Sequence, residues 1–143
     1  MSWEFGASIV AGLAAVTADL RTRMIPNWIP ALAAAAGFAL HTLQGGWSGL
    51  GRSLVGGVLG FGIFLVFYLA GGLGGGDIKL MAAFGTMLGP ARLWTAAWWV
   101  AVCGALLAMV VLLTIRLQGR PARRVSIPYA PAICAGVWIT LAG

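Results

Sequence analysis

The fold is decided by residues 53–72, SLVGGVLGFGIFLVFYLAGG, a run of 20 residues that contains no charged side chain. A helix of about 20 apolar residues is long enough to span the hydrocarbon core of a bilayer, which is roughly 30 Å thick. Residues 93–115 form a second run of this kind. The remaining apolar runs are shorter and cover residues 5–20, 27–43, 78–89 and 126–142. We therefore expect an all-α polytopic membrane protein with about six transmembrane helices, the fourth of them short.

The composition of the whole chain agrees with this expectation. Of its 143 residues, 61% are hydrophobic and 8% are charged, and the mean hydropathy is +0.97. A soluble domain carries about a quarter charged residues, so this chain has too few to cover a water-facing surface. The net charge of +6 does not indicate nucleic-acid binding, because the basic residues stand singly or in one short loop between apolar runs. The length predicts one transmembrane domain, residues 1–143.

The basic residues predict how the chain is oriented in the membrane. If all six runs cross, the loops after the first, third and fifth runs lie on one side. These loops contain seven basic residues, which are Arg21, Arg23, Lys79, Arg116, Arg120, Arg123 and Arg124. The opposite side contains Arg52 and Arg92. Loops rich in Lys and Arg remain in the cytoplasm, so we expect the first side to be cytoplasmic.

Asp77 is one of three carboxylates in the chain, and it follows a row of glycines. An aspartate at this place can simply cap the next helix by accepting backbone N–H bonds. A cap needs one non-helical residue, however, and not a row of glycines. Gly74, Gly75 and Gly76 would also let a second backbone, such as an extended peptide, approach the carboxylate closely. Lys79 has two interpretations, because it can extend to the membrane surface or hold the neighbouring carboxylate ionised.

Asp19 lies near the end of the first apolar run, where a carboxylate opposes the helix dipole. It can be an interfacial charge paired with Arg21 or Arg23. With Asp77 on the same expected side, a paired-carboxylate site becomes the better hypothesis, because ionisable groups at membrane depth are usually functional. Two close carboxylates share one proton, so one acts as a base toward water and the other as an acid toward a carbonyl oxygen. Such a pair can hydrolyse an amide.

No competing catalytic machinery is visible in the sequence. His41 stands alone, and Cys103 and Cys134 lie separately inside apolar runs, without the spacing of a zinc or redox motif. No glycine-rich loop ends in the Gly-Lys-Ser/Thr of a phosphate-binding loop. Glu4, the remaining carboxylate, falls on the outer side, where we expect a solvated charge. The sequence therefore predicts neither a metal site nor a cofactor.

Around the two aspartates, the sequence resembles the type IV prepilin peptidases, which are membrane aspartic proteases of the GxGD type. The family signature Gly-x-Gly-Asp-x-Lys-Leu is matched by residues 74–80. The first-aspartate segment, Asp followed by Ile-Pro-Asn, is matched by Asp19 and residues 25–27. A later proline-rich element resembles residues 127–132, Ile-Pro-Tyr-Ala-Pro-Ala. The likeness covers nearly the whole chain.

This resemblance implies an aspartic endopeptidase with Asp19 and Asp77 as its catalytic pair, and with Gly74 to Gly76 and Lys79 at the substrate approach. It implies that the substrates are prepilin-like precursors of pilus assembly and protein secretion, whose short basic leaders are removed at the cytoplasmic face of the inner membrane. Some members also N-methylate the product, through an N-terminal extension with paired CxxC motifs. The chain begins at the first helix, so it resembles the compact peptidase-only form of Flp (tight-adherence) pili, and we expect no methylation.

Other functions stay open on the residues alone. A small proton- or cation-coupled transporter would also place two aspartates at membrane depth. A structural membrane subunit would tolerate the change of both aspartates to asparagine. The larger intramembrane proteases of the presenilin and signal-peptide-peptidase type share the GxGD motif, although the Ile-Pro-Asn segment after Asp19 argues against them. The sequence does not indicate the oligomeric state or which precursor is cleaved.

Overall fold

The structure, a computed structural model, describes residues 3–119 and 127–143. Within these ranges the chain forms four helices and no strand. The helices are α1 (Trp3–Thr22), α2 (Trp28–Leu69), α3 (Gly75–Leu117) and α4 (Ala130–Ala142). Over the same residues, three helices, α1 to α3, are long and apolar enough to cross a membrane. The expectation of an all-α fold with membrane-length helices is confirmed. Three arginines of the expected cytoplasmic side lie outside the described residues, namely Arg120, Arg123 and Arg124.

The prediction of six separate helices is wrong, because neighbouring apolar runs are joined into single long helices. The second and third runs both fall in α2, and the fourth and fifth both fall in α3. Each long helix is interrupted by one non-helical glycine, Gly46 in α2 (φ 57°) and Gly89 in α3 (φ 68°). These φ angles lie in the left-handed region that favours glycine. The sequence showed breaks in the apolar runs at residues 44–52 and 90–92, but in the structure these residues are helical except for Gly46, so neighbouring runs belong to one bent helix.

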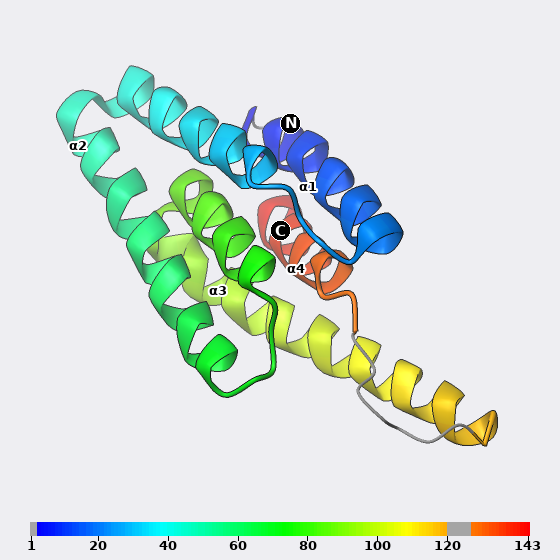
Figure 1. The fold of residues 1–143 in the computed structure, drawn as a ribbon. Coiled ribbons are helices and arrows are strands. Elements are labelled where there is room, and N and C mark those ends of the chain that lie inside the picture. The colour runs from blue at the N-terminus through cyan, green and yellow to red at the C-terminus, as the bar shows by residue number, and fades with distance from the viewer. Residues whose placement is uncertain (1–2, 120–126) are drawn as a thin grey trace.

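Both long helices fold back on themselves at these glycines (Figure 1). We call the part of each helix before the glycine its first arm and the part after it its second arm. The bend in α2 is tight enough to place the backbone of Gly49 against the carbonyl group of His41. A straight helix with the 42 residues of α2 would be about 63 Å long, twice the hydrocarbon thickness of a bilayer. The bend therefore brings both arms of α2, residues 28–45 and 47–69, to the scale of a membrane.

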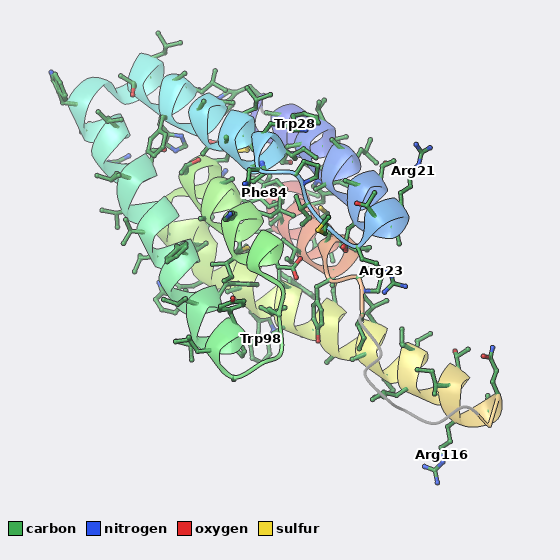
Figure 2. All side chains as sticks on the ribbon, viewed as in Figure 1. Arg21, Arg23, Trp28, Phe84, Trp98 and Arg116 are labelled. Atoms are coloured by element: carbon green, nitrogen blue, oxygen red, sulfur yellow. The ribbon has the colours of Figure 1, made fainter. Side chains whose placement is uncertain are left out.

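The first arm of α3 is the most deeply buried part of the described chain, and Phe84 lies fully buried at its middle (Figure 2). Small residues allow the second arm of α2 to pack directly on it. A Cβ atom added to Gly56 or to Gly85 would meet the backbone of the other residue. The Ser53 hydroxyl also donates a hydrogen bond to the Thr86 carbonyl oxygen at 2.8 Å. This packing fixes the helix whose first turn carries Asp77.

The outer surface of the bundle is apolar. Large side chains such as Leu32, Val58 and Leu113 are exposed on α2 and α3. A helix whose exposed positions are also apolar is typical of a membrane-spanning segment, because lipid surrounds it in place of water.

Candidate active site

Asp19 lies in the last turn of α1 and is buried, with 7% of its surface exposed. Its Oδ2 accepts a hydrogen bond from the backbone N–H of Ala130, the first residue of α4, at 3.2 Å. The N-terminus of a helix carries unpaired N–H groups and a partial positive charge, and both stabilise a carboxylate. The start of α4 thus compensates for the unfavourable position of Asp19 at the end of its own helix.

Asp77 lies in the first turn of α3 and is also buried, with 8% of its surface exposed. Its Oδ2 accepts the backbone N–H of Gly74 at 3.0 Å, and its own backbone N–H donates to the Gly74 carbonyl at 3.1 Å. The bond to the carboxylate is the N3 half of a capping box, in which Gly74 is the N-cap residue and Asp77 is the third residue of the helix. Asp77 therefore caps the start of the helix by accepting a backbone N–H, as one alternative expected, but from the third helical position and not as the N-cap residue, and this bond engages one of its two carboxylate oxygens.

The fold brings the two carboxylates together although they are far apart in sequence. Asp19 and Asp77 lie within electrostatic range of each other, and both lie within range of the buried Cys134 thiol of α4. The segment between α1 and α2 packs on the first turn of α3 through Ile25, which is buried. A Cβ atom on Gly76 would approach the Ile25 Cβ to 3.1 Å. The chain that leaves Asp19 therefore rests directly beside the turn that carries Asp77.

The three glycines before Asp77 differ in their surroundings. Gly74 is exposed and extended, with φ −84° and ψ 156°, and it is the N-cap residue of α3. Gly75 is exposed at the start of the helix, and a Cβ atom added to it would lie 4.0 Å from the Tyr68 ring. Gly76 faces Ile25, so its lack of a side chain is explained by packing inside the protein. Open backbone for an approaching peptide is therefore found at Gly74 and Gly75.

Lys79 contacts a residue that sequence reasoning did not assign to the site. Its Nζ donates a hydrogen bond to the Asn27 Oδ1 at 2.9 Å, and both residues are exposed. In the sequence, Asn27 was noted only as the last residue of the Ile-Pro-Asn segment and was not predicted to be a site residue. A side-chain contact between residues 52 positions apart leaves no local signal in a single sequence. The same holds for the Ala130 amide, since every residue except proline carries a backbone N–H.

An apolar groove opens next to the starts of α3 and α4, where the backbone N–H groups of Gly74 and Ala130 bind the two carboxylates. It has a volume of about 490 Å³ and lies mainly between the second arms of α2 and α3. Aromatic side chains dominate its wall, among them Phe64, Phe67 and Trp98 (labelled in Figure 2). Its rim includes Leu73, the residue before Gly74, and Tyr129, the residue before Ala130.

The third carboxylate belongs to another part of the molecule. Glu4 accepts a hydrogen bond from the Arg92 Nη1 at 2.6 Å in an ion pair. Among the residues that the structure describes, no group of three or more His, Cys, Asp or Glu side chains could hold a metal ion. The described chain brings the carboxylate of Asp19, at the end of α1, near that of Asp77, in the first turn of α3.

Comparison with known proteins identifies the family. Residues 7–118 match the type IV leader peptidase family. The chain is 39% identical over 132 residues to the prepilin leader peptidase/N-methyltransferase of Bacillus subtilis (strain 168). That match covers 87% of this chain and 48% of the relative, so the chain spans about half of the relative's length. No solved structure matches. The resemblance seen in the sequence is confirmed, and the chain belongs to the type IV leader peptidase family.

Proposed function

We propose that this chain is a membrane-embedded aspartic endopeptidase that removes the short basic leader of Flp-like type IV prepilins, with Asp19 and Asp77 activating the attacking water. The observation that carries the proposal is the pair itself. In a chain of the leader peptidase family, two buried carboxylates lie within electrostatic range, and each is fixed through Oδ2 by a backbone N–H at the start of a helix.

The proposed reaction needs one ionised and one protonated carboxyl group. The ionised group takes a proton from water while the water oxygen bonds to the carbonyl carbon of the scissile peptide. The protonated group gives its proton to the carbonyl oxygen, which produces a tetrahedral diol. The C–N bond then breaks as the first group passes its proton to the leaving nitrogen and the second takes a proton from the diol. The leader keeps a new carboxyl group, the product a new amine, and the pair is restored.

The geometry favours this chemistry because the carboxylates are held in place before the substrate arrives. Backbone N–H groups at helix starts are fixed dipoles that do not reorganise during a reaction. Asp19 and Asp77 each receive such a bond, from Ala130 and Gly74. The exposed backbone at Gly74 and Gly75 gives an extended peptide access to Asp77. We therefore propose Gly74 and Gly75 as the substrate approach.

We call the end of the bundle that contains Asp19 and Asp77 the aspartate end. We also propose that this end faces the cytoplasm, with the protein in the inner membrane. Arg21, Arg23 and Arg116 extend from the ends of α1 and α3 (Figure 2). The opposite end holds Arg52 and Arg92, which line one pocket at the two bends. An excess of basic residues at the aspartate end supports a cytoplasmic location.

Cysteine labelling in cells tests this orientation. In a background without the two native cysteines, we expect single cysteines at positions 21 and 116 to react only with reagents that reach the cytoplasm. A cysteine at position 52 should react from outside. Labelling of positions 21 and 116 from opposite faces would contradict the proposal.

Cleavage of a prepilin by the purified protein in liposomes tests the function. We expect a single cut after the leader, and sequencing and mass of the product should show a new, unmethylated N-terminus. A methylated product would contradict the expectation made from the sequence. If the protein leaves the prepilin intact and carries protons or cations across the liposome membrane, the transporter alternative is correct.

A further inference from the structure

The relative position of the two aspartates is not set by direct packing of their helices. α1 packs mainly on α4 and α2 and makes few contacts with α3. Asp19 is in α1 and Asp77 is in α3, so other parts of the chain must fix their separation. One is α4, through the Ala130–Asp19 bond. The other is the link at residues 23–27, which follows α1 and leads into α2.

This link has little regular structure of its own. Arg23 adopts a left-handed conformation (φ 56°) where α1 ends, and the residues that follow it lie outside any helix. A segment without its own ladder of hydrogen bonds is positioned by its contacts with other elements. Two such contacts join the link to α3: the packing of Ile25 on Gly76 and the hydrogen bond between Asn27 and Lys79.

The two contacts lie on one face of α3. Gly76 and Lys79 are three residues apart in the helix, and residues with this spacing are neighbours on a helix surface. They meet Ile25 and Asn27, which are two residues apart in the link. Attachment at two neighbouring points fixes both the distance of the link from α3 and its register along the helix. Asp77 precedes Lys79 by two residues, which corresponds to a rotation of about 200° around the helix axis. The side chains of Asp77 and Lys79 therefore leave α3 on nearly opposite sides.

We infer that Asn27 and Lys79 form a positioning pair, whose hydrogen bond, together with the Ile25–Gly76 contact, holds the end of α1 in register with α3 and so sets the geometry of Asp19 relative to Asp77. This inference rests on the proposed function. It assigns Asn27 a role that the sequence did not indicate. It also gives Lys79 a task other than contact with the substrate or direct interaction with Asp77.

The inference predicts a loss of rate without a comparable loss of substrate binding. A misplacement of about 1 Å can lower an enzyme's rate by about 100-fold. We expect Asn27→Leu, which keeps the size but removes the acceptor, to lower kcat by about 10- to 100-fold and to leave KM within about threefold. Lys79→Met, which keeps the stem but removes the donor, should do the same. Asn27→Asp keeps an acceptor and should retain most of the activity.

The experiment is a double-mutant cycle on cleavage of a prepilin in liposomes, with thermal unfolding of each variant measured in detergent. The double variant Asn27→Leu/Lys79→Met should be no slower than the slower single variant, because both changes break one contact. Arg52→Met, at the other end of the bundle, is the matched control and should keep the wild-type kcat. Rate losses that multiply in the double variant, or a raised KM with unchanged kcat, would overturn the inference.

The reversed pair keeps the test decisive if the single variants are too unstable to assay. Asn27→Lys/Lys79→Asn places donor and acceptor in exchanged positions, and we expect it to recover folding and most of kcat. A folded reversed pair as slow as the single variants would overturn the inference. Asp19→Asn and Asp77→Asn are assayed in parallel. If both are inactive while Asn27→Leu has the wild-type kcat, only the positioning role fails. If either well-folded aspartate variant cleaves normally, the proposed function itself fails.

Discussion

The two ends of the helical bundle hold their carboxylates in different ways. At the end with the two bends, Glu4 forms an ion pair with Arg92, whose side chain is 56% exposed. At the other end, Asp19 and Asp77 are buried, and each accepts a backbone N–H. An arginine supplies its partner with a permanent positive charge, because it cannot give up its proton in a protein. Fixed backbone dipoles near a second carboxylate orient the group and still allow it to exchange a proton.

The ends also differ in how the chain builds them. Each bend is a local feature that depends on one glycine in the left-handed region. The aspartate end is assembled from the last turn of α1, the first turns of α3 and α4, and the link at residues 23–27. A site assembled from distant segments depends on the packing of the whole bundle, so changes at the two ends should have unlike consequences.

The largest effect that we expect separates the three carboxylates by their function. Asp19→Asn and Asp77→Asn should each lower prepilin cleavage by at least about 10³-fold, because an amide nearly preserves the shape but cannot exchange the proton. The double variant should lose no more than either single variant, since the two groups act as a unit. Glu4→Gln is the matched control and should cleave within about twofold of wild type. Near-normal cleavage by either aspartate variant, with its helicity and thermal stability intact, would refute the pair.

A smaller effect, on stability, is expected where α2 supports the aspartate end. Gly56→Ala should destabilise the protein by about 1–3 kcal/mol, because the new methyl group meets the Gly85 backbone. Gly62→Ala, in the same arm of α2 but with open space around it, should be neutral or slightly stabilising. Thermal unfolding in one detergent measures both changes. Equal stability of the two variants would show that this close packing does not hold the first arm of α3.

The sequence was sufficient to place the two aspartates at helix ends but not to describe how they are held. Apolar runs reveal helices because lipid imposes a length and a composition on any segment that crosses it. They do not reveal the one-residue bends, where helical structure continues directly beyond Gly46. The partners of Asp19 and Lys79 were missed for another reason. Ala130 is 111 positions from Asp19, and Asn27 is 52 positions from Lys79, so only the folded chain brings them together. The catalytic roles of Asp19 and Asp77 remain predictions.

The smallest effect that we expect is that of a chelator on cleavage, which should be none. A metal-dependent peptidase needs a cluster of ligands that lowers the pKa of a bound water, whereas here the carboxylate pair would take the water proton directly. The described residues contain no group of three or more His, Cys, Asp or Glu that could form such a cluster. Initial cleavage rates should therefore be equal in EDTA, in untreated buffer and in buffer with added zinc. Complete loss of cleavage in EDTA, restored by zinc, would show that a metal activates the water. The contrast between the two ends would then say nothing about catalysis, because the aspartates would act as ligands or supports.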